Sequence, residues 1–217
     1  MRFRKTAAFL ASCLLLATGT ALAAVGPTEQ LRSGVENILT LLNDQAITAE
    51  SRNQKIEQIV RAHFEFDVMS QWILGIHWRK AAPAERERFK ELFTQLLEAT
   101  YKGRIGEYAG QYTDEQVEYA SERIIEGRAL VDTFVVTGNR KIPISYKLIQ
   151  KDQQWKVYDV VIEGVSLVSN YRSTYDEIVR KEGLDGLFSR MEEKISQLRS
   201  GQITPEEAIP KAGGGAK

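Results

Sequence analysis

The spacing of apolar residues changes twice along this chain, and this constrains the fold more than any other feature of the sequence. From about residue 28 to 101, apolar side chains recur every three or four positions, as on one face of a helix. Between 115 and 162, Val, Ile, Tyr and Phe alternate with polar residues, which is typical of strands. Helical spacing returns after Gly164. We therefore predict an α+β architecture of helices, an antiparallel sheet of about four strands, and helices again.

The boundaries of these elements follow from the same pattern and from turn residues between them. Helices are expected at 28–43, 49–64, 66–76, 83–101 and on both sides of a stop at Gly183, and strands at 115–120, 129–137, 141–150 and 154–162. The short turns between strands favour a meander of hairpins. We expect one domain over residues 24–203, followed by a flexible tail over 204–217.

The first 23 residues have the pattern of a cleavable signal peptide. Basic residues precede an apolar run over 7–17, and Ala21-Leu22-Ala23 offers a cleavage site. The run is shorter than the roughly 20 residues that a membrane span needs. Cys13 follows Leu10-Ala11-Ser12, which resembles a lipobox, but that alternative would leave apolar leucines at the mature start. We predict cleavage after Ala23, no stable membrane anchor, and export to the periplasm of a Gram-negative bacterium.

The chemistry-bearing residues form no recognisable catalytic or metal-binding pattern. The chain has 29 Lys+Arg and 29 Asp+Glu, so its charge gives no support for nucleic-acid binding. His63 and His77 do not have metal-ligand spacing. The segment 164–168 around Ser166 has only the first of the two glycines of a nucleophile elbow. Ser166 is therefore expected to cap a helix. Asp159 and Glu163 are candidates for an acid–base pair, although a hydrogen-bonding role at the strand end is the simpler interpretation. We predict no enzyme activity and no cofactor.

A series of short segments along the chain occurs together in one known family. They are Phe66-Asp67-Val68-Met69, Leu74-Gly75, Trp78-Arg79, Pro83-Ala84-Glu85-Arg86, Trp155-Lys156-Val157-Tyr158-Asp159-Val160, Glu163–Arg172 and Gly183–Leu187. In order and spacing they resemble the MlaC, or toluene-tolerance auxiliary, family. Its members are periplasmic phospholipid-binding proteins of the system that maintains outer-membrane lipid asymmetry. The resemblance covers roughly residues 31–198.

The resemblance implies both a fold and a function. The fold would be an NTF2-like curved sheet joined to a helical subdomain, with an internal apolar cavity for acyl chains. The function would be a shuttle that carries diacyl phospholipid between an outer-membrane lipoprotein–porin complex and an inner-membrane ABC transporter. Burying a methylene is worth about 0.8 kcal/mol, so exposing the roughly thirty methylenes of two chains would cost ~20 kcal/mol or more. The cavity is therefore expected near the upper end of the roughly 300–1,000 Å³ of ligand sites.

The wall of such a cavity is expected to come from the large apolar side chains of the helices and one sheet face. These lipid-binding candidates are Trp72, Leu74, Trp78, Phe89, Phe93, Leu96, Leu97, Tyr101, Ile144, Tyr146, Leu148, Tyr171 and Tyr175. Periodicity alone does not separate a cavity wall from a solid core. Arg104 and Arg172 are the candidates to meet the lipid phosphate, with structural salt bridges as the alternative.

Three other functions fit parts of the pattern. The first is a small-molecule or enzyme role on an NTF2-like scaffold, for which an enzyme would use Asp159, Tyr146 and a histidine as its polar groups. The second is a solute-binding component of an ABC transporter, although such receptors usually have two α/β lobes and this chain lacks β-α-β alternation. The third is a lipoprotein chaperone, which also shields acyl chains.

Overall fold

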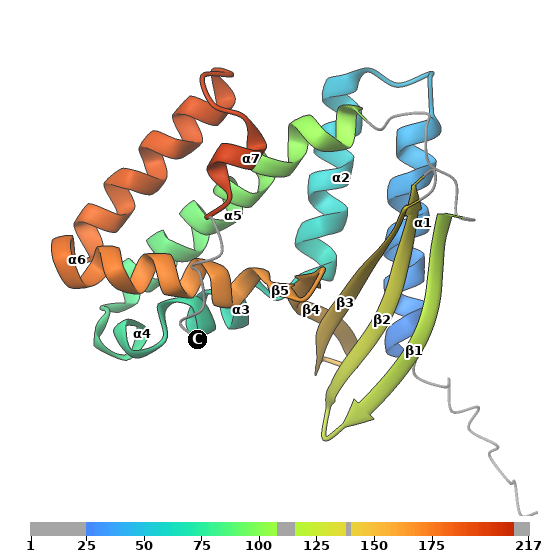
Figure 1. Ribbon diagram of the computed structural model, residues 1–217, viewed down its shortest axis with the longest axis horizontal. Helices are drawn as coiled ribbons and strands as arrows, with labels where there is room; N and C mark the ends of the chain where they lie inside the picture. The colour runs from blue at the N-terminus through green and yellow to red at the C-terminus, as the bar shows by residue number, and fades with distance from the viewer. Residues whose placement is uncertain (1–24, 108–115, 138–139, 211–217) are drawn as a thin grey trace, which may run out of the picture.

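The structure is a computed structural model that describes residues 25–107, 116–137 and 140–210. It has two adjoining parts, a curved sheet with two helices beside it and a bundle of helices (Figure 1). The predicted signal peptide and the end of the predicted tail lie outside the described residues.

The order of the elements confirms the predicted α+β architecture. Along the chain they are α1 (Pro27–Asn43), α2 (Ala49–His63), α3 (Phe66–Leu74), α4 (Ile76–Lys80), α5 (Pro83–Glu107), β1 (Val117–Ile125), β2 (Arg128–Thr137), β3 (Arg140–Lys151), β4 (Gln154–Ile162), β5 (Val165–Ser166), α6 (Leu167–Arg199) and α7 (Pro205–Ala208). The described sheet has five strands where about four were expected, because β5 is too short to give an alternating pattern. β1 also runs on to Ile125, past the predicted end at 120.

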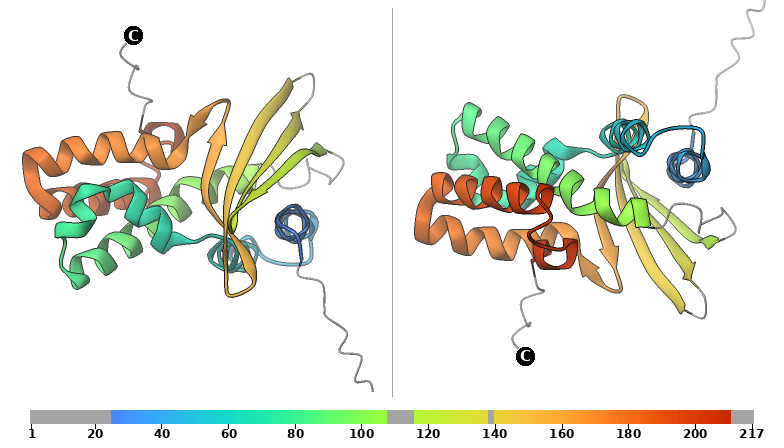
Figure 2. Two further views of the ribbon diagram at one scale, coloured as in Figure 1. Left: turned by 90° about the horizontal axis from the view of Figure 1, so that it is seen from below. Right: turned by 90° about the horizontal axis from the view of Figure 1, so that it is seen from above.

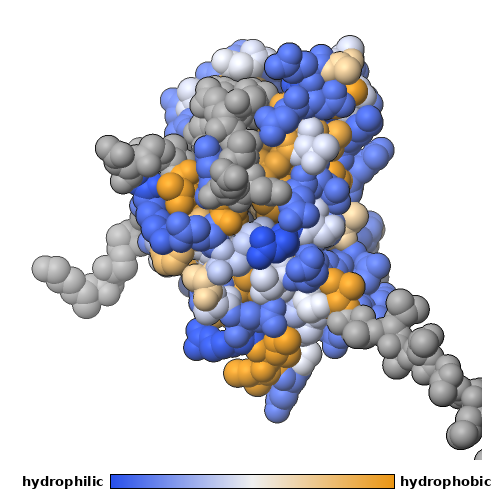
Figure 3. Space-filling model, turned by 90° about the vertical axis from the view of Figure 1, so that its right-hand side faces the viewer, coloured by the Kyte–Doolittle hydropathy of each residue, from blue (hydrophilic) through white to orange (hydrophobic). Residues whose placement is uncertain are grey.

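The sheet is an antiparallel meander in the order β1-β2-β3-β4-β5, as predicted. The turn between β1 and β2 contains Glu126 and Gly127, both with positive φ, which is the conformation that two-residue hairpins favour. Figure 2 shows α1 and α2 end-on beside one face of the sheet. Ile124 and Ile125 at the end of β1 remain 51% and 71% exposed, and Figure 3 shows hydrophobic side chains at the lower end of this face of the molecule.

The helical part has an aromatic core. Phe93 of α5 is fully buried, and its ring meets that of Tyr171 of α6 edge-on at 5.2 Å. Phe89 and Tyr175 make a second perpendicular pair at 6.0 Å. Gly183 has a φ of 74° and interrupts α6, which confirms the predicted helix stop at this position. The two halves of α6 therefore fold back on each other around the core (Figure 1).

Asp159 links the sheet to the helical part. Its carboxylate is 3% exposed and accepts hydrogen bonds from Lys147 Nζ at 2.8 Å, Ser166 Oγ at 2.8 Å and the Val168 N–H at 3.1 Å. Ser166 in turn accepts a hydrogen bond from the Ser169 N–H and caps α6. The structure therefore places Asp159 in the hydrogen-bonding role and Ser166 in the capping role that the sequence favoured.

Asp159→Ala is expected to lower the free energy of unfolding by about 2–4 kcal/mol. The substitution leaves the buried Val168 N–H and the Ser166 hydroxyl without their acceptor and removes a partner from Lys147. Urea denaturation followed by circular dichroism measures the change. The exposed Asp185 serves as the matched control, and its replacement by alanine should change stability by less than about 1 kcal/mol. Equal effects of the two substitutions would mean that Asp159 does not hold the two parts together.

The first residues of the predicted tail contact α6. Thr204 and Glu207 form a capping box at α7, and Ala208 is fully buried. Lys194 of α6 donates a hydrogen bond to the Ala208 carbonyl at 3.2 Å. Asn170 donates another to the carbonyl of Pro210. Ala208 and Pro210 are therefore bonded to α6, and the domain boundary at 203 stays a prediction.

Candidate functional site

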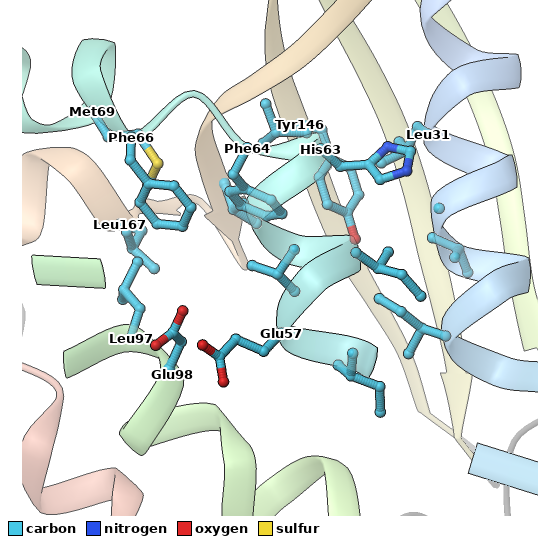
Figure 4. Close-up of a pocket in the computed structure, with 18 of the residues that line it drawn as sticks. Leu31, Glu57, His63, Phe64, Phe66, Met69, Leu97, Glu98, Tyr146 and Leu167 are labelled. Atoms are coloured by element: carbon cyan, nitrogen blue, oxygen red, sulfur yellow. The ribbon is translucent and has the colours of Figure 1, made fainter. Parts of the chain in front are cut away.

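An apolar pocket lies between the α1–α2 pair and the sheet, and α3, α5 and α6 close one end of it (Figure 4). It has a volume of about 330 Å³. This is near the lower end of the range for ligand sites, whereas the sequence analysis expected the upper end. The pocket is partly open, and the enclosed cavity implied by the resemblance stays a prediction.

Both helices and two strands contribute their apolar faces to this pocket. The lining residues are Leu31, Gly34, Val35 and Ile38 of α1; Asn53, Ile56, Glu57, Ile59, Val60 and His63 of α2; Ile144 and Tyr146 of β3; Val157, Val160 and Ile162 of β4; and Phe64, Phe66, Met69, Leu97, Glu98 and Leu167. The helical spacing in α1 and α2 and the alternation in β3 and β4 turn these side chains to a common side. The wall is thus almost entirely hydrocarbon.

Gly34 allows α1 and α2 to approach closely. A Cβ atom at this position would lie 3.1 Å from the ring of His63. The imidazole therefore packs against the backbone of α1 and forms part of the pocket wall. Burial, with a smaller contribution from Lys156, lowers the pKa of His63. The ring is consequently neutral at neutral pH.

Hydrogen bonds fasten the α1–α2 pair to the sheet at the start of α1 and the end of α2. The Thr28 N–H donates to Glu122 of β1 at 2.8 Å, and Gln30 accepts from the Trp155 N–H at 2.9 Å. After α2, the Glu65 N–H donates to the Val157 carbonyl at 2.8 Å. The turn between α1 and α2 is fixed by bonds within the helix pair. There, the guanidinium of Arg52 donates hydrogen bonds to the Leu41 and Asp44 carbonyls.

Two carboxylates lie at the pocket margin facing α5. Glu57 of α2 and Glu98 of α5 point toward the same space in Figure 4. Arg61 pairs with both, at 3.3 Å to Glu57 and 3.0 Å to Glu98. Burial raises the pKa of Glu98, although Arg61 acts in the opposite direction. This margin therefore carries two carboxylates that share one arginine.

Tyr146 carries a hydroxyl group into the apolar wall. Burial raises its pKa to about 12, with no hydrogen bond contributing to the shift. The side chain keeps some accessible surface because that surface borders on the pocket. Its hydroxyl oxygen lies among the hydrocarbon side chains in Figure 4.

The predicted lipid-binding residues divide into groups. Leu97, Ile144 and Tyr146 line the pocket. The residues packed in the two cores are Leu74, Phe89, Phe93, Leu96, Tyr171 and Tyr175 in the helical part and Leu148 in the sheet. Trp78 packs against the helical core, and Trp72 is 42% exposed beside Tyr158. The side chain of Tyr101 lies outside those described. Contact with lipid stays a prediction for all of them.

Of the two predicted phosphate partners, only Arg172 has a described side chain, and it does not line the pocket. The guanidinium of Arg172 packs over Gly75, where a Cβ atom would lie 3.1 Å from Nη2. Gly75 joins α3 to α4, so Arg172 belongs to the helical part. Arg104 has a side chain outside those described.

No site role was predicted for α1 and α2, although they supply much of the pocket wall. Their apolar stripes, which include Val35, Ile38, Ile59 and Val60, were visible as helical spacing. A stripe that packs on a neighbour and a stripe that borders on a pocket have the same spacing. The apolar stripes of α1 and α2 were therefore visible in the sequence, but the sequence does not show whether a stripe faces another element or a pocket.

The arrangement is suited to holding hydrocarbon. In the described part of the chain, no group of three or more His, Cys, Asp or Glu side chains is placed to hold a metal ion. The carboxylate of Asp159 is engaged in the fold-stabilising bonds given above. No helix in the described ranges combines the length and apolarity needed to cross a bilayer.

Comparisons with known proteins point to one family. The family model described as MlaC protein matches residues 32–193. The intermembrane phospholipid transport system binding protein MlaC of Haemophilus influenzae is 23% identical over 192 residues, which cover 84% of this chain and 88% of that protein. The toluene tolerance protein ttg2D of Pseudomonas putida is 25% identical over 133 residues, 60% of each chain.

A solved structure has the same fold. It is that of a phospholipid-binding protein from Ralstonia solanacearum in complex with a phospholipid, and its TM-score with this chain is 0.71. The two sequences are 22% identical, and the match covers 81% of this chain and 99% of the other.

Proposed function

This chain belongs to the MlaC family, and from that premise we propose that it is a phospholipid-binding shuttle whose pocket receives acyl chains. The observation that carries the proposal is the hydrocarbon wall between the α1–α2 pair and the sheet, in a fold shared with a protein that was solved with phospholipid bound. Leu97, Ile144 and Tyr146 are proposed to contact lipid, together with the pocket-facing residues of α1 and α2.

The energetics of carrying a lipid favour this kind of site. Each methylene kept from water contributes about 0.8 kcal/mol, so most of both chains must be covered during transport. Moving the chains from a bilayer into the pocket exchanges one apolar surrounding for another. The transfer breaks no covalent bond, and we assign the protein no catalytic role.

The pocket must widen to take two chains, because about 330 Å³ is small for such a ligand. The attachments of α1 and α2 to the sheet suggest how. Thr28 and Glu65 tie one end of the pair to the sheet, whereas Arg52 bonds the other end within the pair. We propose that the pair pivots about its attached end and moves its turn away from β3 and β4.

The setting of this activity is also part of the proposal. The basic and apolar pattern of residues 1–23 supports export to the periplasm. The name of the Haemophilus influenzae relative places that protein in an intermembrane phospholipid transport system. We propose corresponding partners for this chain, an outer-membrane lipoprotein–porin complex and an inner-membrane ABC transporter.

Organic-solvent extraction of the purified mature protein, followed by mass spectrometry, tests the binding function. We expect about one diacyl phospholipid for each folded chain. A folded protein that yields no phospholipid, and takes up none when incubated with vesicles, would contradict the proposal.

A further inference from the structure

The hydroxyl group of Tyr146 is a polar atom on the pocket wall that the binding of hydrocarbon does not explain. It lies on β3, whose neighbours across the sheet at this point are Val131 and Val160. Its environment is apolar enough to raise its pKa to about 12. Among the described residues, it has no hydrogen-bond partner.

An unpaired hydroxyl in such surroundings is costly, and a bound ligand that offers an acceptor would remove the cost. A phenol donates one hydrogen bond at neutral pH. Leaving such a donor unpaired when the pocket fills with hydrocarbon would cost free energy, because displaced water would no longer satisfy it. A ligand with an oxygen acceptor at this depth would bind better than one with hydrocarbon alone.

The charged groups around the pocket indicate whether the acceptor for the Tyr146 hydroxyl is a phosphate oxygen or a neutral oxygen of the lipid. A phosphate would need a cation, and the described residues that line the pocket include no lysine or arginine. They do include Glu57 and Glu98, and Arg61 beside them is already paired with both carboxylates. His63 is neutral at neutral pH and offers no charge to a phosphate. A neutral acceptor therefore fits the wall, and in a diacyl phospholipid the neutral acceptors next to the chains are the ester carbonyls.

We infer that the hydroxyl group of Tyr146 donates a hydrogen bond to an ester carbonyl oxygen of the bound lipid. This inference rests on the proposed function, since it places a phospholipid in the same pocket. Its consequence is selectivity, because a lipid with ether-linked chains has the same hydrocarbon and head group but no carbonyl. The site therefore prefers acyl esters to alkyl ethers.

Competition between the two lipid types tests this. The mature protein is incubated with vesicles that contain equal amounts of diacyl and dialkyl phosphatidylethanolamine with chains of the same length, then separated and extracted for mass spectrometry. A neutral hydrogen bond predicts that the wild-type protein captures about 5–10 times more ester than ether lipid. Tyr146→Phe removes only the hydroxyl oxygen, so the captured ratio of ester to ether lipid should fall to within about twofold of equality.

Tyr158→Phe is the matched control. Tyr158 lies beside Trp72, at 6.2 Å between ring centroids, and does not line the pocket, so the variant should retain the ester preference. Equal capture of both lipids by the wild-type protein, or an unchanged preference in Tyr146→Phe, would overturn the inference and leave lipid binding intact. Capture of neither lipid by the wild-type protein would overturn the proposed function as well.

Discussion

Ile38→Glu is expected to remove nearly all bound phospholipid while the protein stays folded. Ile38 lines the pocket from α1 and is only half-buried, so a glutamate there is hydrated in the empty protein. Lipid chains entering the pocket would strip that water from the charge, at a cost of several kcal/mol. We therefore expect on the order of a hundredfold less phospholipid to be recovered by extraction, with a melting temperature within a few degrees of the wild type.

Asn37→Glu is the matched control for this variant. It places the same charge one position earlier on α1, where the side chain is exposed and does not line the pocket. It should retain full lipid recovery. If Ile38→Glu is folded and carries as much phospholipid as Asn37→Glu, the acyl chains do not lie between α1 and the sheet.

Phe93→Glu is expected to prevent folding, whereas Ile38→Glu is expected to leave the protein folded. Phe93 is fully buried, with the Tyr171 ring at 5.2 Å and the Phe89 ring stacked at 6.0 Å. Truncation of a buried phenylalanine alone costs about 3–5 kcal/mol, and an unpaired buried carboxylate adds several more. Such a sum is comparable to the whole free energy of unfolding of a typical domain. The variant should be insoluble or show no cooperative unfolding transition.

Phe93→Leu is the control that distinguishes a loss of lipid binding from a loss of folding. This change keeps the site apolar and should cost about 1–2 kcal/mol, with phospholipid recovery unchanged. A Phe93→Glu protein that is soluble, folded and free of lipid would instead place Phe93 on the wall of the site, where the sequence analysis expected it.

Local signals predicted the elements well. The apolar spacing placed α1 within one residue of its observed bounds, and Gly183 marked the break in α6. The capping residue Ser166 was also readable, because its role depends on neighbours a few positions away. The two-residue strand β5 was missed because a pattern of period two needs more residues to appear.

The pocket was harder to predict because it depends on what lies opposite each apolar face. Ile144 and Phe93 look equally suited to a cavity wall in the sequence, yet one borders on the pocket and the other is packed among aromatic rings. Ile144 faces the α1–α2 pair, whose place is set by the close approach at Gly34 and by the bonds of Thr28 and Glu65 to the sheet, whereas Phe93 faces Tyr171 of α6. These contacts join residues far apart in the chain.

A crystal structure of the mature protein purified with its natural lipid tests the central claim most directly. We predict two acyl chains between the α1–α2 pair and strands β3 and β4, with the turn between α1 and α2 farther from the sheet than it is here. Chains lying instead among α3, α5 and α6, with the pocket at Tyr146 empty and unchanged, would contradict it.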